Sequence, residues 1–459
     1  MRDPVVRAGV CVVVLSVSGA TGLADECGPS AKLLADDGAP SDRFGYSVAM
    51  SQGVVVIGAR HTDDTIEDSG SAYLFDALTG AQLAKLLPDD AEPMDQFGYS
   101  VAIDGAISLV GAAHDDDNGN LSGSAYLFDV SDPAHPVQLA KLLPDDGQTT
   151  DYFGRSVGLA GGWAVIGAWG DADLGNDSGA AYVFDVSHPA RPAQVAKLLP
   201  DDGEAFDHFG YSVAIDGQTA IVGAIFDDDN GSLSGSAYLF DVRTGEQIAK
   251  LVPDDGGEDD EFGNAVAIDG AVAIVGAHYD GDNGTASGSA YLFDATTGKQ
   301  LAKLLPDDGA SIDKFGTSVA ISAERAVVGA RHDDDNITDS GSAYLFDETT
   351  GKQLAKLLPD DGEAFEEFGI SACVEGNVAV LGAWLDDDNG DKSGSAYVFD
   401  LACPCPADVN ADGNLNILDF VAFQLFWQHA DPAADCDANA AFNILDFVCF
   451  QQLFQAGCP

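Results

Sequence analysis

Two twelve-residue segments near the C-terminus carry side chains suited to one chemical task, the binding of a hard cation. They read DVNADGNLNILD at 408–419 and DCDANAAFNILD at 435–446. Oxygen donors at positions 1, 3, 5, 9 and 12, with a backbone carbonyl at position 7, form the ligand pattern of a calcium loop. Position 6, which needs a sharp turn, is glycine only in the first segment. The predicted Ca²⁺ ligands are Asp408, Asn410, Asp412, Asn414, Asn416 and Asp419, and in the second loop Asp435, Asp437, Asn439, Ala441, Asn443 and Asp446.

Each of these loops leads into an amphipathic segment, at 417–428 and 444–454, which predicts a helix. Prolines in the Cys- and Pro-rich linker 401–407 exclude a helix before the first loop. A duplicated loop followed by a helix, with Asp at position 12, resembles the EF-hand-like dockerin module over residues 408–459. The resemblance implies calcium-dependent folding and docking to a cohesin-like protein or a cell-surface anchor. A calcium-stapled end-cap without a partner is the alternative.

The rest of the chain is dominated by seven copies of one unit. Phe-Gly recurs seven times, and Gly-Ala follows fourteen residues after each Phe. Every copy then carries a segment of the type Ser-Gly-Ser-Ala-Tyr. A period near fifty residues is typical of propeller blades. The phenylalanines are Phe44, Phe97, Phe153, Phe209, Phe262, Phe315 and Phe368.

Each copy contains four short runs rich in β-branched and aromatic residues, separated by turn residues. Four strands make one propeller blade. A strand of the type AKLL precedes the first Phe-Gly, at 31–34, and none follows the last copy at 395–400. Pairing 31–34 with 395–400 closes the ring and removes both bare edges. The sequence therefore predicts an all-β, seven-bladed propeller over residues 31–400, which we expect to be monomeric.

These repeats resemble the FG-GAP family, relatives of the integrin α-chain propeller, over roughly residues 31–400. The resemblance implies a binding or cell-adhesion module. Integrin-type repeats often hold calcium in a loop between Phe-Gly and Gly-Ala. Here that link is a tight turn such as Asp216-Gly217, so the resemblance does not imply calcium at that place. The proline that follows Gly-Ala in the family pattern is also missing.

The formal net charge of −56 argues against nucleic acid and anionic membranes as partners. The connections from strand 4 to strand 1 hold 28 acidic residues and those from strand 2 to strand 3 hold 23, together 51 of 76. Both sets lie on one face of a propeller, so this face is acidic. Acidic runs such as 227–230 are compatible with two roles, keeping the protein soluble or binding calcium. The lysine in every AKLL strand is expected to protect the outer edge of its blade.

No catalytic constellation is apparent, and we expect no enzymatic activity. His61, His114 and His332 follow Gly-Ala at one offset, whereas the equivalent residues elsewhere are Gly170, Phe226, Tyr279 and Leu385. A position that varies in this way fits a binding or tolerant surface better than a proton relay. Trp169, Trp384, Phe226 and Tyr279 lie on or beside the same rim, where they could stack on a ligand or pack between blades.

The N-terminus reads as a signal peptide over residues 1–24, because Arg2 and Arg7 precede a short apolar run and small residues. We therefore expect a secreted protein, extracellular or at the cell surface, without a membrane span. Seven cysteines lie beyond residue 24, so at least one thiol is free or pairs with another chain. The leading hypothesis is a binding protein with an anchoring tail that takes a glycan or protein ligand on its propeller. The alternative is a lectin or a component of a polysaccharide-degrading system.

Overall fold

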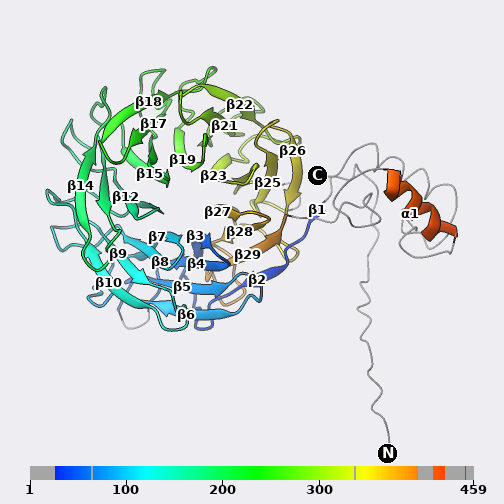
Figure 1. The fold of residues 1–459 in the computed structure, drawn as a ribbon, viewed down its shortest axis with the longest axis horizontal. Helices are drawn as coiled ribbons and strands as arrows, with labels where there is room; N and C mark the ends of the chain where they lie inside the picture. Colours follow the sequence, from blue (N-terminus) through cyan, green and yellow to red (C-terminus); the bar gives the residue numbers. More distant parts are fainter. Residues whose placement is uncertain (1–25, 64–65, 335–336, 402–416, 429–449, 451–459) are drawn as a thin grey trace, which may run out of the picture.

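The computed structural model describes residues 26–63, 66–334, 337–401, 417–428 and 450. In this part of the chain, seven antiparallel sheets stand in a ring around a central axis (Figure 1). Each blade has four strands in sequential order, with the first strand nearest the axis. The predicted all-β, seven-bladed propeller is confirmed.

The blades are numbered by their Phe-Gly segments. Their strands are, in blade 1, β3 (Phe44–Ser51), β4 (Val54–Ala59), β5 (Ser71–Asp76) and β6 (Gln82–Leu86); in blade 2, β7 (Phe97–Asp104), β8 (Ile107–Ala112), β9 (Ser124–Asp129) and β10 (Val137–Leu142); in blade 3, β11 (Ser156–Ala160), β12 (Trp163–Ala168), β13 (Ala180–Asp185) and β14 (Ala193–Leu198). In blade 4 they are β15 (Phe209–Asp216), β16 (Thr219–Ala224), β17 (Ser236–Asp241) and β18 (Glu246–Leu251); in blade 5, β19 (Phe262–Asp269), β20 (Val272–Ala277), β21 (Ser289–Asp294) and β22 (Gln300–Leu304). In blade 6 they are β23 (Phe315–Ser322), β24 (Arg325–Ala330), β25 (Ser342–Asp347) and β26 (Gln353–Leu357); in blade 7, β27 (Phe368–Glu375), β28 (Val378–Ala383), β29 (Ser395–Asp400) and, from the N-terminus, β2 (Ala31–Leu33).

The ring closes as the sequence predicts. Strand β2 pairs antiparallel with β29, so that Lys32 lies opposite Tyr397 and Leu33 opposite Ala396. A parallel bridge between Phe44 and Gly394 joins blade 7 to blade 1. One feature was not predicted: β1 (Glu26–Cys27) pairs parallel with β26 and adds a fifth strand to blade 6. The N-terminal segment therefore contacts two neighbouring blades.

The hydrophobic core lies between the blades. In blade 4 the ring of Phe209 meets Tyr238 at 5.5 Å and Phe240 at 5.7 Å, both edge to face. These rings pack with Val165 and Val183 of blade 3 in one buried cluster. Such clusters recur around the ring, each built from two adjacent blades. Burial of these faces therefore stabilises the ring as a whole rather than single blades.

The expected helix at 417–428 is present as α1 (Ile417–Gln428), which includes Asp419. The other predicted calcium ligands, at 408–416 and 435–446, lie outside the described residues, as do the predicted signal peptide 1–24, linker residues 402–407 and almost all of the second predicted helix. None of the helices in the described ranges has the length and apolar character that crossing a bilayer requires. Cys373 is a free thiol whose burial raises its pKa to about 12, so it is a poor nucleophile.

Candidate functional site: an arginine-containing axial pocket

The propeller axis holds a pocket of about 360 Å³. It is lined by the residue that follows Phe-Gly in each blade, together with four of the residues that follow Gly-Ala. The flanking motifs are nearly identical between blades, but these two positions vary. The first set is Tyr46, Tyr99, Arg155, Tyr211, Asn264, Thr317 and Ile370, and the second is Arg60, His278, Arg331 and Trp384. The fold therefore places its variable side chains together around one cavity.

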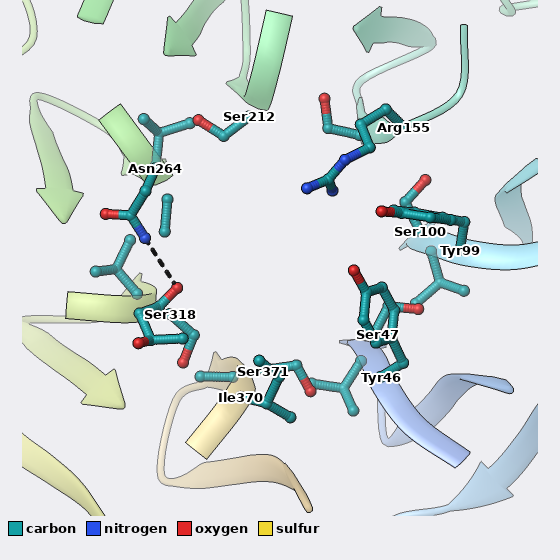
Figure 2. A pocket seen from close by; sticks show the side chains of 18 of the residues that line it. Tyr46, Ser47, Tyr99, Ser100, Arg155, Ser212, Asn264, Ser318, Ile370 and Ser371 are labelled. Atoms are coloured by element: carbon teal, nitrogen blue, oxygen red, sulfur yellow. Dashed lines mark hydrogen bonds between the residues drawn. The ribbon is translucent and has the colours of Figure 1, made fainter. Parts of the chain in front are cut away.

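Serines next to the pocket hold adjacent blades in register. Ser212 Oγ donates to the carbonyl oxygen of Gly263 in the next blade at 2.7 Å, and equivalent serines make this bond in five other blades. Blade 5 has Ala265 at the serine position, and the amide of Asn264 donates to Gly316 O at 3.0 Å instead. Figure 2 shows these side chains surrounding an open centre. The frame of the pocket is thus fixed by hydrogen bonds that do not use its variable positions, except in blade 5.

Two arginines in the pocket are held by aromatic rings. The Arg60 guanidinium carbon lies 3.8 Å from the centroid of Tyr46 and 4.7 Å from that of Tyr99. That of Arg155 lies 4.3 Å from Tyr211 and 4.8 Å from Tyr99. In Figure 2 the Arg155 guanidinium projects into the open centre, near Tyr46 and Tyr99. Within the described ranges, no carboxylate pairs with Arg60 or Arg155.

The opposite side of the pocket contains two carboxylates, of which one has a cationic partner. Arg331 lies 3.6 Å from Glu367, which also accepts a hydrogen bond from Trp384 Nε1 at 3.1 Å. His278 lies 3.5 Å from Glu261. Burial, and then the positive charges of Arg331 and Lys314, lower the pKa of His278 to about 3, so this ring is neutral near pH 7. On this side, Glu367 therefore has a cationic partner, whereas Glu261 lies beside a neutral ring.

The four rim aromatics predicted from the sequence have different environments. Trp384 lines the pocket. Trp169 is stacked on Tyr152 at 4.6 Å and also contacts His208, which in turn contacts Phe226. Tyr279 is 38% exposed and accepts a hydrogen bond from Lys314. Trp384 also packs against Tyr46 of the next blade, with ring centroids 5.5 Å apart. Packing therefore accounts for Trp169, Phe226 and in part Trp384, whereas Tyr279 is exposed.

The side chains of the three rim histidines do not form a catalytic arrangement with one another. His61 Nδ1 pairs with Asp68 at 2.9 Å, and His332 lies 3.6 Å from Asp339 and 3.7 Å from Glu367. His114 contacts the rings of Tyr99 and Tyr152. Burial, followed by the charge of Arg60, lowers the pKa of His114 to about 4. These environments suit structural contacts better than proton transfer.

The strand-4 lysines have a role beyond the expected protection of the outer edge. Lys197 Nζ does not simply guard an edge; it contacts Asp146 at 2.9 Å and both Asp171 and Asp173 at 2.7 Å. The hydroxyl of Tyr182 donates to Asp146 and Asp171. Comparable contacts surround Lys32, Lys141, Lys250 and Lys303. Each of these lysines therefore ties the connection entering its blade to the loop between strands 2 and 3.

The strand-4 lysines contact the acidic runs in which calcium binding was considered. In the run 227–230, Asp227 and Asp229 both contact Lys250, and Asp227 is almost fully buried. A tethered ammonium group thus lies among carboxylates that would otherwise suit a hard cation. Across the described ranges, no group of three or more His, Cys, Asp or Glu side chains is arranged to hold a metal.

A second buried carboxyl group lies near each lysine cluster. Asp95 accepts a hydrogen bond from the backbone N–H of Glu92 at 2.7 Å, and Glu366 accepts one from Glu363 at 2.8 Å. Burial raises the pKa of each to about 7; the hydrogen bond opposes this, and the neighbouring Asp115 or Asp386 adds to it. Each carboxyl group therefore binds its proton more tightly in the folded chain than in the unfolded one.

We expect the double variant Asp95→Asn/Glu366→Gln to gain stability relative to the wild type as the pH rises from about 4 to about 7. In the wild type, the unfolded carboxyl groups ionise near pH 4 and the folded ones only near pH 7. Their stabilising contribution is complete below the first value and is lost by the second. Melting curves at several pH values measure the difference, in which the histidine contributions cancel. The exposed variant Asp145→Asn should show no such trend, and a difference that shrinks with pH would contradict the assignment.

Arg60 and Arg155, the two pocket arginines held by aromatic rings, were not predicted from the sequence. The signal was present, since aligning the seven copies shows one variable residue directly after Phe-Gly and another directly after Gly-Ala. The offset compared above was one residue further along, at the position of His61. That position lies on the rim rather than in the pocket.

Comparison with known proteins yields one sequence family. The model of the FG-GAP repeat matches seven segments: 28–75, 81–128, 136–184, 192–240, 246–293, 299–346 and 352–399. No curated protein sequence matches the chain. Among solved structures, the chain is similar to a crystal structure of the computationally designed Ika8 protein. The two share 16% identity and a TM-score of 0.47, over 80% of this chain and 99% of that one.

Proposed function

This chain belongs to the FG-GAP repeat family, and we propose that it is a non-enzymatic binding protein that takes its ligand in the axial pocket. One observation carries the proposal: the residue after Phe-Gly, which varies among otherwise similar blades, lines the same cavity in all seven, together with four of the variable residues after Gly-Ala. A volume of about 360 Å³ is within the range of small-molecule sites, and its lining mixes rings with a few polar groups. The pocket lies at the start of the first strands, so the acidic connections surround it.

The proposal extends to export and anchoring. The N-terminal segment 1–24 has the pattern of a signal peptide, which supports a location outside the cell or on its surface. Residues 408–459 are proposed to fold around calcium as a dockerin-like module and to bind a cohesin-like protein or another surface anchor. The donor pattern of the first loop and helix α1, which begins at the tenth residue of that loop, support this part.

We expect the mature chain to bind calcium with higher affinity at residues 408–419 than at 435–446, because only the first loop has glycine at position 6. Titration calorimetry on the mature chain measures the uptake. The variant Asp408→Ala/Asp412→Ala, which removes two of the proposed oxygen donors, should lose the tighter site, and Asp435→Ala/Asp437→Ala should leave it intact. Calcium uptake that neither variant changes would place the ion elsewhere.

A pocket-filling variant tests the binding function. Tyrosine already follows Phe-Gly in three blades, so Thr317→Tyr/Ile370→Tyr should fill the cavity while the blade frame tolerates it. The wild-type chain and this variant are screened against glycans and small metabolites by thermal shift and titration calorimetry. A ligand of the pocket should bind the wild type without being turned over, and the variant should no longer bind it. Binding that persists in the filled variant, or hydrolysis of a polysaccharide, would refute the proposal.

A further inference from the structure

The cations of this chain fall into two groups that the structure treats differently. The lysines of strand 4 lie among carboxylates, as Lys197 does with Asp146, Asp171 and Asp173. Arg60 and Arg155 have no such partner in the part of the chain that is described. The sequence has 76 acidic residues and only 20 Lys and Arg. In a chain with so many carboxylates, charge neutralisation does not explain why these two arginines at the axis have no carboxylate partner among the described residues.

Aromatic contacts hold these arginines without using up their donors. Stacking occupies the face of a guanidinium group, whereas its N–H groups point outward in its plane. Arg155 stands between the rings of Tyr99 and Tyr211 and projects into the pocket (Figure 2). Arg60 is held by Tyr46 and Tyr99, and its buried Nε has no hydrogen-bond partner. Tyr211 also hydrogen-bonds to Arg155. Both groups are therefore fixed in place, and a guanidinium group has five N–H donors, more than these contacts use.

The charges around the pocket favour binding of an anion on the side formed by blades 1 to 3. Of the carboxylates near the pocket, Glu367 lies beside Arg331 and Glu261 beside the neutral ring of His278, both on the side of blades 5 to 7. The pKa of Tyr46 is lowered from its usual value: burial raises it, but the charges of Arg155 and Arg60 outweigh this. The half of the pocket formed by blades 1 to 3 is thus a region of positive potential.

We propose that the axial pocket binds a small carboxylate-bearing ligand, with Arg155 and Arg60 supplying charged hydrogen bonds to the carboxylate. The proposal rests on the binding function proposed above and names the chemical class of the ligand. A guanidinium group matches a carboxylate in two parallel N–H···O bonds. The hydroxyl and amide groups of Ser47, Asn264 and Thr317 line the remaining space. Such a lining suits a hydroxylated acid of monosaccharide size.

Matched pairs of acid and neutral compounds provide the test. The mature chain is titrated calorimetrically with glucuronate and glucose, galacturonate and galactose, and succinate and succinamide. At least one acid should bind about tenfold or more tightly than its neutral partner. Arg155→Gln should lower the affinity for that acid by on the order of tenfold and leave the affinity for any neutral ligand unchanged. Arg155→Lys keeps the charge but loses the paired N–H donors and the stacking, so its affinity for the acid should fall between those of the wild type and Arg155→Gln, and melting curves establish that both variants fold.

The outcomes separate this inference from the proposed function. If no acid binds more tightly than its neutral partner, or if Arg155→Gln leaves acid binding unchanged, the carboxylate assignment is overturned. In that case, a neutral ligand that is lost in Thr317→Tyr/Ile370→Tyr still supports binding in the pocket. If an acid binds equally well to the filled variant, the axial pocket is not its site and both proposals fall.

Discussion

Replacing Gly223 by alanine is expected to destabilise the propeller by more than about 3 kcal/mol. Gly223 lies in β16, where an added Cβ atom would overlap the carbonyl oxygen of Gly263 in the next blade. Ser212 Oγ donates to that same oxygen at 2.7 Å, so the two blades cannot separate without losing this bond. The obstructing group is backbone on a strand of the neighbouring sheet, which has no rotamer through which to move away. Thermal and urea unfolding, followed by circular dichroism, measure the loss.

A second glycine of the same blade provides the control. Gly217 forms the turn between β15 and β16 with φ +56, and no atom lies within 4 Å of a Cβ added there. Gly217→Ala should therefore lower stability only by the strain of a left-handed backbone conformation, about 1–2 kcal/mol. If Gly223→Ala costs no more than Gly217→Ala, close approach between blades is not what the Gly-Ala motif provides. The comparison separates packing at the interface from local backbone strain.

The architecture was readable from the sequence because it depends on local patterns repeated in register. The Asp-Gly turn at 216–217, the short β-branched runs and the seven-fold recurrence predict blades, and Asp216 does lie opposite Thr219 across that turn. The unmatched strand at 31–34 predicts closure, because each end of the chain leaves one edge unpaired. Each of these inferences needs only neighbouring residues or simple counting.

Contacts between blades could not be predicted in the same way. Lys197 meets Asp146 only because the connection from blade 2 returns past the outer strand of blade 3. Likewise, β1 adds to β26, a pairing of two residues with no pattern of its own. Arg155 lies between Tyr99 and Tyr211 because three consecutive blades place the same position on the axis. A lysine in an outer strand looks like edge protection until the neighbouring blade is present.

The chain therefore separates its structural residues from its recognition residues. Phe209 and Tyr238 pack the blades together, Gly223 allows their close approach, and Ser212 ties the backbones. Directly beside them, the residue after Phe-Gly changes from tyrosine to arginine, asparagine, threonine or isoleucine. Substitutions at this position alter the pocket while the packing motifs stay the same.

Removing the closing strand is expected to have the largest effect of all. A mature chain that begins at Ala35 lacks β2 and should lose at least about 5 kcal/mol or fail to fold cooperatively. It loses the fully buried Leu33, and it loses Lys32, whose ammonium contacts Asp361 at 2.9 Å and Asp386 at 2.7 Å. Asp386 is itself almost completely buried, so the truncation leaves a charge in the interior without its cation. The edge of β29 is exposed as well, which favours aggregation.

A chain that begins at Gly28 is the matched control, because it loses β1 and keeps β2. If the ring is closed by β2, this chain should melt close to the full mature protein, and only the chain that begins at Ala35 should show the large loss. Calorimetric melting and light scattering distinguish the two. If both truncated chains melted alike, the ring would have to be held by the contacts of the other blades alone. The bridge between Phe44 and Gly394 and the bond from Ser371 to Gly45 would then suffice to join blade 7 to blade 1.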